Sequence, residues 1–289
     1  MQKVRKAIIP AAGFGTRFLP QTKAMPKEML PIIDKPIIQY VVEEAVAAGI
    51  TDIIIVTGLY KRSIEDHFDH NAELESRLIE SGKEELVEQI HQIGDMANFI
   101  YVRQKGIYGT GTPILNSAHL IGDEPFLVLY PDDFFLSEVP RAVQLVEQYE
   151  KYGKSVIALT EVPRDEISSY GVADLSDEVG DNTFKLKDVV EKPSTQEAPS
   201  TMASVGGHIL TPEIIPILQD LKPAASGELV LSQAIAKLIQ SDEVYGKVID
   251  GHWHDTGNKE KYLEAIVDVV LATPELRDGF TAFIKKKLG

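Results

Sequence analysis

The sequence has no cysteine among its 289 residues and no long apolar run. The lack of cysteine excludes disulfide bonds and thiolate metal sites, and a reducing compartment is the natural interpretation. The basic Met1–Lys6 and apolar Ala7–Ala12 begin like a signal peptide, but Gly13 and Gly15 interrupt the apolar stretch too early. No later segment is long and apolar enough to span a bilayer. We therefore expect a cytoplasmic protein that is not bound to membrane.

Positive charge is scarce, with 29 Lys and Arg against 44 Asp and Glu and a formal net charge of -15. This excess of acid argues against a general affinity for nucleic acid or anionic membrane. Residues 1–35 reverse the balance, because they hold seven basic residues against Glu28 and Asp34. A basic segment in an acidic protein indicates a local anion site, although an ordinary solvated charge cluster would have the same composition.

Short apolar runs alternate with helical patterns over the first two thirds of the chain. The β-branched Asp52–Thr57 is typical of a central parallel strand, and Ile37–Ala48 has helical spacing that ends at Gly49. The other strands predicted here are Lys6–Pro10, Asn98–Arg103, Phe126–Tyr130 and Ser155–Val162. The other helices are Lys61–Phe68, Ala72–Ile93 as one helix or a pair, Pro113–Leu120 and Val139–Tyr152. This alternation implies an α/β fold with a doubly wound, mixed but mainly parallel sheet.

After Tyr170 the pattern becomes richer in β-strands and less regular. We expect paired strands at Gly171–Leu175 and Thr183–Glu191, a polar loop at Ser194–Thr201, and a strand at Val244–Ile249. Helical patterns follow at Pro212–Leu221, Glu228–Gln240, Asn258–Ala272 and Pro274–Lys287. The chain shows no internal repeat. We expect a single domain over residues 1–289 whose last two helices, in residues 258–289, close the chain.

A loop rich in small residues follows the first predicted strand. Gly13 and Gly15 would let backbone N–H groups approach phosphates closely, and Arg17 and Lys27 would add cations for phosphate oxygens. A tight turn with solvated cations would explain the two glycines equally well. A dinucleotide fingerprint fails because Phe18 stands where its third glycine belongs, and no Gly-Lys-Ser/Thr triplet is present for a Walker loop.

Acidic residues follow another predicted strand, at Asp132 and Asp133. The carboxyl ends of parallel strands border the ligand crevice, and Mg²⁺ prefers one or two carboxylates together with phosphate oxygens. An acidic turn without a ligand is the alternative. Later in the chain, His252 and His254 could suggest a transition-metal site, but the sequence offers no evident third ligand.

These segments resemble the sugar nucleotidyltransferases over nearly the whole chain. The resemblance rests on the run Gly13-x-Gly15-Thr16-Arg17-x-x-Pro20-x-Thr22-Lys23-x-x-Pro26-Lys27. The opening Ala11–Gly13 and the segment Lys23–Pro31 are similar in particular to the bacterial UTP–glucose-1-phosphate uridylyltransferases. The resemblance implies a Rossmann-like nucleotidyltransferase fold in which residues 1–165 mainly bind the nucleotide and a β-rich portion, residues 166–257, mainly binds the sugar.

The resemblance also implies roles for individual residues. The nucleotide contacts it implies are Ala11, Ala12, Gly13, Gly15, Thr16, Gln104, Gly109 and Asp133. The sugar contacts are Glu28, Gly171, Glu191, Lys192 and His208. Asp132 and Asp255 would hold Mg²⁺, the expected cofactor. The residues expected to act in catalysis are Arg17, Lys27, Asp132 and Lys192.

The implied reaction is the transfer of UMP from UTP to glucose 1-phosphate. Thymidylyltransfer stays open, because the Gln104 amide would match thymine as well as uracil. Another hexose phosphate stays open too, because Val205–His208 departs from the family pattern and Gly207 could enlarge the pocket. A silent sugar-nucleotide-binding protein and a Rossmann dehydrogenase are weaker alternatives. The partners expected are UTP, a sugar 1-phosphate and further copies of the chain in a homodimer or homotetramer.

Overall fold

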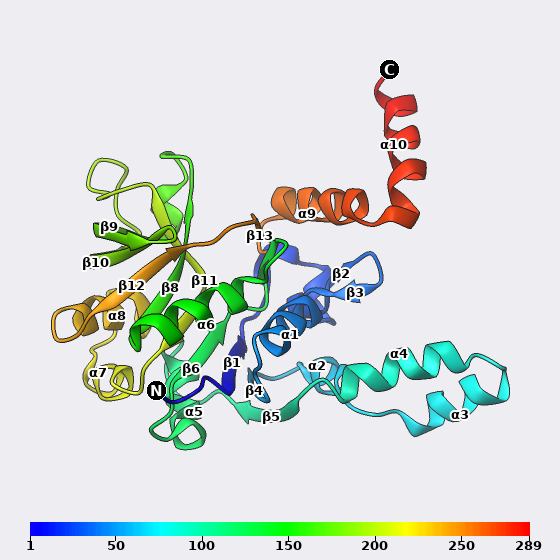
Figure 1. Ribbon diagram of the computed structural model, residues 1–289. Coiled ribbons are helices and arrows are strands. Elements are labelled where there is room, and N and C mark those ends of the chain that lie inside the picture. Colours follow the sequence, from blue (N-terminus) through cyan, green and yellow to red (C-terminus); the bar gives the residue numbers. More distant parts are fainter.

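The computed structural model describes residues 1–289 and is built around one nine-stranded sheet (Figure 1). In spatial order the strands are β5 (Asn98–Arg103), β4 (Asp52–Thr57), β1 (Lys6–Ala11), β6 (Phe126–Leu129), β11 (Met202–Leu210), β8 (Ser155–Glu161), β12 (Val244–Val248), β10 (Thr183–Glu191) and β9 (Gly171–Gly180). The first four strands run parallel, whereas β11 is antiparallel to both β6 and β8. The sheet is thus mixed, as predicted, with four adjacent parallel strands in the amino-terminal half and a further parallel pair, β8 and β12, beyond β11.

Helices cover both faces of this sheet. In chain order they are α1 (Ile37–Ala47), α2 (Arg62–His67), α3 (Ala72–Glu80), α4 (Glu84–Gly94), α5 (Thr112–Ile121), α6 (Arg141–Tyr152), α7 (Ile214–Asp220), α8 (Leu231–Ile239), α9 (Lys259–Ala272) and α10 (Pro274–Leu288). Side chains of α1, α6 and α9 belong to one buried cluster, and those of α5, α7 and α8 belong to the other. None of these helices has both the length and the apolar composition that crossing a bilayer requires.

Strand β1 shows how one run of residues serves both clusters. Side chains alternate across a strand, so Ala7 and Ile9 face the α1 side while Ile8 faces the α5 side. All three are completely buried. A continuous apolar run, rather than an alternating one, is therefore required of a strand covered on both faces.

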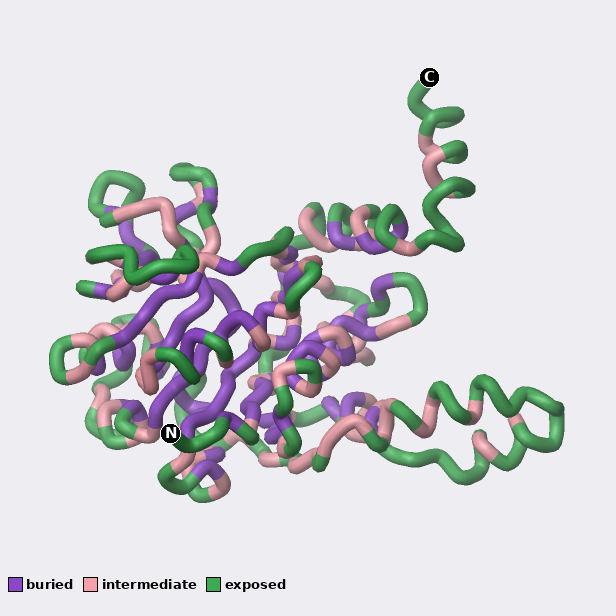
Figure 2. Tube along the Cα trace, viewed as in Figure 1, coloured by how far each residue is buried: buried purple, intermediate pink, exposed green.

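Two segments extend away from the body. The α3–α4 pair projects from the end of the sheet near β5, and α10 carries the carboxyl terminus outward (Figure 1). Both segments are largely exposed in Figure 2, and α10 has no buried residue. The exposed apolar side chains of α10 include Leu276, Phe283 and Leu288. The homodimer or homotetramer expected from the sequence stays a prediction.

Short elements, in contrast, escaped prediction. β7 (Asp133–Leu136) and β13 (His252–Asp255) pair as a separate antiparallel ribbon that sets Asp133 opposite Asp255. β2 (Pro31–Ile32) and β3 (Lys35–Pro36) form another ribbon of only two residues a strand. Such strands are too short for an apolar period to show, and β13 consists of a tryptophan, two histidines and an aspartate.

A few boundaries also differ from the predicted ones. β11 was missed altogether, because Gly206 and Gly207 interrupt its apolar pattern. α6 begins at Arg141 rather than Val139, since Pro140 disfavours helical geometry in the residue before it. β9 extends to Gly180, five residues beyond the predicted end at Leu175. The Ala72–Ile93 pattern, predicted as one helix or a pair, forms the pair α3 and α4.

A buried ion pair joins α1 to α6 below the ribbon. The Arg141 side chain is completely buried, and its Nε and Nη2 donate to the two carboxylate oxygens of Glu44 at 2.8 and 2.9 Å. The same guanidinium donates to the Asp133 carbonyl at 3.1 Å, and the Ala142 N–H donates to Glu44 at 2.9 Å. Arg141 of α6 is therefore hydrogen-bonded both to α1 and to the turn that follows the carboxyl end of β6.

Replacing Arg141 by alanine is expected to lower the free energy of unfolding by about 3–5 kcal/mol, because the Glu44 charge would stay buried without a partner. Urea denaturation of wild type and variant measures this difference. Arg62→Ala is the matched control, since its pair with Asp66 is exposed and should contribute less than about 1 kcal/mol. An equal loss of unfolding free energy in the two variants would show that the buried Arg141–Glu44 pair contributes no more than the exposed pair.

Candidate active site

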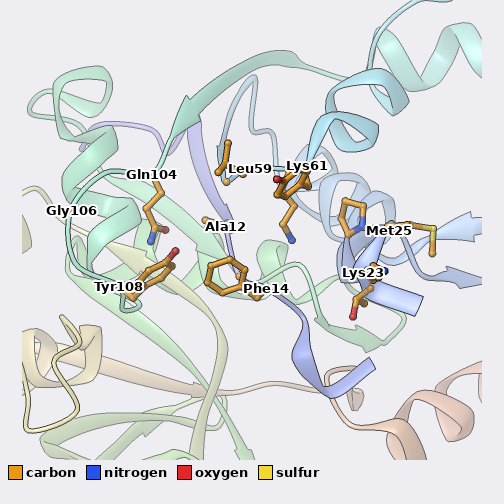
Figure 3. Close-up of a pocket in the computed structure, with 15 residues that line it drawn as sticks. Ala12, Phe14, Lys23, Met25, Leu59, Lys61, Gln104, Gly106 and Tyr108 are labelled. Carbon is orange, nitrogen blue, oxygen red and sulfur yellow. The ribbon is translucent and has the colours of Figure 1, made fainter. Parts of the chain in front are cut away.

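A cavity lies where β1, β4 and β5 reach their carboxyl ends, and its walls come from the small-residue loop and two neighbouring loops (Figure 3). The residues lining it are Ala12, Gly13, Phe14, Thr22, Lys23, Ala24, Met25, Pro26, Gly58, Leu59, Tyr60, Lys61, Gln104, Gly106 and Tyr108. We call it the loop cavity. The Gln104 amide lies at one end near the rings of Phe14 and Tyr108, whose centroids are 5.6 Å apart, and Lys61 and Lys23 lie at the other.

The small-residue loop has its shape because of local contacts. Gly15 has a φ of 66°, and a Cβ there would lie 3.1 Å from the Lys27 side chain. The Thr22 hydroxyl donates to the Gly15 carbonyl at 2.7 Å and holds the loop against the following turns. Ala12 and Gly13, just before this turn, line the cavity.

Not every expected nucleotide contact lines this cavity. Ala12, Gly13 and Gln104 do, whereas Ala11 is completely buried at the end of β1. Gly109 has a φ of 135°, and a side chain there would overlap the backbone of Leu229. The structure thus requires glycine at position 109 for packing against Leu229. Thr16 lies outside the lining, at the exposed start of a 3₁₀ turn.

A second cavity lies beside the ribbon and the ends of β9, β10 and β11. We call it the acidic cavity, because Asp132, Asp133, Asp255 and Glu191 line it. Its other expected members are Arg17, Gly171, Lys192 and His208. Residues that lie far apart in the sequence therefore line one cavity. Lys27 connects the cavities, because it follows Pro26 of the loop cavity and its ammonium donates to the Asp132 carboxylate.

Asp132 and Asp255 converge at Gly257. A Cβ at that glycine would lie 3.0 Å from Asp255 Oδ1, and 3.1 Å from both Asp132 Oδ2 and Arg17 Nη1. The Thr256 N–H and hydroxyl hold the Asp132 carbonyl at 2.9 and 2.8 Å. Two carboxylates aimed at one small space form the hard oxygen donor set that Mg²⁺ prefers, so these residues fit that ion.

The surroundings of Asp132 and Asp255 shift the pKa values of these two carboxyls in opposite directions. Burial opposes ionisation of Asp132, but the charges of Lys27 and Arg17 outweigh it and hold the pKa below its usual range. Burial and the neighbouring Asp132 raise the pKa of Asp255, although the Gly257 N–H opposes this. The Asp132 carboxylate is thus kept charged, ready for a cation.

Asp133 faces inward from the same turn. The Trp253 indole N–H donates to its carboxylate, and Arg141 Nη1 lies 3.5 Å away. Burial raises the pKa of Asp133 to about 7, while Arg141 and Trp253 oppose the rise. A side chain at Gly206 would overlap this carboxylate. Asp133 was expected to contact the nucleotide, but it lines the acidic cavity and not the loop cavity.

The expected sugar residues Glu191 and Lys192 lie at the end of β10. The Ser232 hydroxyl donates to Glu191 Oε2 at 2.7 Å, which fixes the carboxylate in the cavity wall. Lys192 has a φ of 46°, and its side chain is 60% exposed, with Nζ 3.8 Å from Glu191 Oε1. A left-handed lysine is a strained conformation of the kind found at functional sites. Its N–H donates to the Tyr170 carbonyl at 3.0 Å, which holds it in place.

Two expectations for the sugar side need correction. Glu28 does not line the acidic cavity, because it is completely buried and its carboxylate pairs with Lys61 at 2.7 Å. Gly207 cannot enlarge the cavity, because a side chain there would meet Arg141 and Leu145 on the opposite face of β11. His208 does line the cavity. Burial and the nearby Arg141 lower its pKa to about 3, so the ring is neutral.

Several residues of the two cavities were not foreseen. Lys61 follows β4, and the rule that ligands bind at the carboxyl ends of parallel strands could have found it. Ser232 belongs to no recognisable motif, and its hydrogen bond to Glu191 depends on α8 packing beside β10. Trp253 was not predicted to be a site residue, and its contact with Asp133 depends on the ribbon register.

Comparison with known proteins gives consistent results. A model of the nucleotidyl transferase family matches residues 6–270. The chain is 45% identical to the UTP–glucose-1-phosphate uridylyltransferase YngB of Bacillus subtilis, over 98% of this chain and 95% of that protein. It superposes on a UDP-glucose pyrophosphorylase complexed with UDP-glucose, with a TM-score of 0.86, 40% identity, and coverage of 93% of this chain and 100% of that one. A UTP-bound UGPase from Acinetobacter baumannii gives a TM-score of 0.90 at 35% identity, covering 97% and 98%.

The raised pKa of Asp133 predicts a dependence of stability on pH. Between the ordinary pKa of 3.8 and about 7 the folded protein keeps the Asp133 proton and the unfolded chain has lost it. Raising the pH through this window therefore lowers the free energy of unfolding, by up to roughly 1.4 kcal/mol per pH unit. Asp133→Asn accepts the same indole hydrogen bond but cannot ionise, so its stability should fall less.

Urea denaturation of wild type and Asp133→Asn in EDTA, at about pH 5 and about pH 8, measures the difference. The comparison cancels the titration of all other groups. Parallel loss of stability in both proteins would show that Asp133 is ionised throughout this range.

Proposed function

The chain belongs to the nucleotidyl transferase family, and we propose that it transfers UMP from UTP to glucose 1-phosphate, with release of pyrophosphate and formation of UDP-glucose. The observation that carries this proposal is the junction of the two cavities. Lys27 and Arg17 bring positive charge to Asp132 and Asp255, between a loop cavity suited to a nucleotide and an acidic cavity suited to a sugar phosphate.

In the proposed reaction the sugar phosphate is itself the nucleophile. A phosphate monoester has a second pKa near ~6, so it is largely dianionic at neutral pH and needs no general base. The buried His208 imidazole, whose pKa is lowered to about 3, would in any case be a poor proton acceptor. The phosphate oxygen attacks the α-phosphorus of UTP in line with the departing pyrophosphate. Positioning and charge neutralisation are therefore the main contributions required of the protein.

The loop cavity is proposed to hold UTP. The Gln104 amide offers both a donor and an acceptor to the imide edge of uracil, beside the apolar rings of Phe14 and Tyr108. The backbone from Ala12 to Thr16 would receive the phosphates, with Arg17 and Lys27 stabilising the departing pyrophosphate. Residues 1–165 would thus mainly bind the nucleotide, although Arg17 and Asp132 also line the acidic cavity.

The acidic cavity is proposed to hold the sugar phosphate. Glu191, fixed by Ser232, would accept hydrogen bonds from sugar hydroxyls, and Lys192 would hold the phosphate. The Gly171 backbone and the neutral His208 complete the sugar wall. Residues 166–257 contribute most of these groups, and Gly206 leaves space only for Asp133.

Mg²⁺ is the proposed cofactor, with Asp132 and Asp255 as its protein ligands; when bound it neutralises charge on the reacting phosphates. The chain's own residues prepare the site for this. Lys27 and Arg17 keep Asp132 ionised, and the Thr256 hydroxyl and N–H fix its backbone. Lys27, whose ammonium donates to Asp132, would add positive charge beside the departing pyrophosphate.

Asp132→Asn is expected to keep the fold and to raise the activation free energy by roughly 3–4 kcal/mol. This lowers kcat about 100- to 1000-fold, because a neutral amide binds a hard cation poorly. Turnover measured over a range of Mg²⁺ concentrations tests this. Asp34→Asn, which removes an exposed acid outside both cavities, is the control. Near wild-type turnover of Asp132→Asn at limiting Mg²⁺ would refute the assignment.

The proposed substrates are tested by pyrophosphate release with UTP, dTTP, CTP or ATP against the 1-phosphates of glucose, galactose, mannose and N-acetylglucosamine. We expect the highest kcat/KM for UTP with glucose 1-phosphate. A tenfold lead for another sugar, about 1.4 kcal/mol in transition-state binding, would overturn glucose while keeping the reaction class. Absence of pyrophosphate release with every pair would favour a silent binding protein.

A further inference from the structure

Strand β13 has two faces with different neighbours. Trp253 and Asp255 point to the acidic cavity, whereas His252 and His254 approach α9, where Asp268 lies. We propose that His252, His254 and Asp268 form a binding site for a divalent transition-metal ion, with Zn²⁺ as the ion that their chemistry suits. This site is separate from the Asp132 and Asp255 pair that the reaction uses.

The three side chains are spaced as ligands of one ion. His252 Nδ1 lies 2.9 Å from Asp268 Oδ2, and His254 Nε2 lies 3.7 Å from the same oxygen. One ligand atom from each residue lies within 4.8 Å of the other two. Zn²⁺ bonds to nitrogen and oxygen of about 2.0–2.2 Å place tetrahedral ligand atoms roughly 3.4 Å apart. The two separations from Asp268 Oδ2 bracket this value, so rotation of the side chains would bring the three ligand atoms around one ion.

The buried imidazole of His254 supplies independent support. His254 is only 3% exposed, and its Nε2 has no hydrogen-bond partner. An unpaired buried nitrogen is costly and therefore rare in folded proteins. The ring cannot easily turn away, since it lies against Phe134 with centroids 5.2 Å apart. A metal ion between His254 and Asp268 would satisfy this nitrogen.

A second group of similar composition lacks this feature. His70, Glu75 and His91 also lie close together, between α3, α4 and the α2–α3 loop. There His91 Nε2 bonds Glu75 at 2.9 Å and His70 Nε2 bonds Asp95 at 3.2 Å. Both histidines are more than two-fifths exposed, and neither has a buried nitrogen without a partner. Ordinary hydrogen bonds explain this group, so a metal ion is not needed to account for it.

The donor set indicates the class of metal. Two imidazoles and one carboxylate suit zinc and its neighbours in the transition series, while Mg²⁺ prefers oxygen ligands. The His252 side chain is 69% exposed, so water can fill the remaining position. Such an ion would join α9 to the strand that carries Asp255 without touching a substrate.

The test uses His91→Ala as the reference protein, because this change removes the second histidine group. Zn²⁺ is titrated calorimetrically into the full-length, chelator-treated reference, and Co²⁺ is added separately to record the visible absorption of tetrahedral coordination. In the presence of excess Mg²⁺, which competes for the carboxylates of Asp132 and Asp255 but not for imidazole ligands, we expect one tight equivalent of Zn²⁺, a higher Tm with Zn²⁺, and a tetrahedral Co²⁺ spectrum. Activity is not measured, so the outcome is independent of the proposed transferase reaction.

Adding Asp268→Asn or His252→Ala to the reference should weaken Zn²⁺ binding by more than about tenfold, since even second-shell changes have effects of that size. Both side chains are partly exposed, so their replacement removes little packing. His119→Ala, which removes an exposed histidine of α5, is the matched control and should bind like the reference. Absence of saturable binding to the reference, or equal binding after Asp268→Asn, would overturn the proposal.

Discussion

The buried guanidinium of Arg141 holds together the parts on which the candidate site depends. It is a charge without access to water, so its donors must all be met by Glu44 of α1 and by the Asp133 turn. That turn begins β7, and β7 sets the position of β13 and so of Asp255. The convergence of Asp132 and Asp255 at Gly257 therefore rests on an ion pair that lies behind them and touches no ligand.

The parallel half of the fold could be predicted from sequence because β1, β4 and β6 are apolar runs buried on both faces, with β5 beside them at the edge. Asp52–Thr57 and Asn98–Arg103 have the predicted bounds, and the strand at Lys6 ends one residue later than expected. Position relative to those strands then located the small-residue loop and Asp132. In the antiparallel half, β11 could not be predicted, because its two glycines serve contacts with Asp133 and Arg141 that no local pattern records.

The grouping of site residues was predictable only in part. The resemblance assigned all of these residues to the site, and each of them lines the acidic cavity: Arg17, Asp132, Glu191, Lys192 and Asp255. It could not show which way a side chain points. Glu28 points inward to Lys61 because of the 3₁₀ turn that contains it. Gly207 lies on the face of β11 away from the cavity because successive residues of a strand alternate between its faces. The direction in which a side chain points is set by tertiary packing, and a linear motif says little about it.

Gly109 and Gly206 have a consequence for how the gene can vary. A Cβ at the first would overlap the Leu229 backbone, and one at the second would overlap the Asp133 carboxylate. All four glycine codons share their first two bases, so a change in either base encodes a residue with a side chain or a stop. Only the third base of these codons is free to drift. At both positions, silent change is therefore the only kind of point variation that leaves the Gly109 loop and strand β11 as they are.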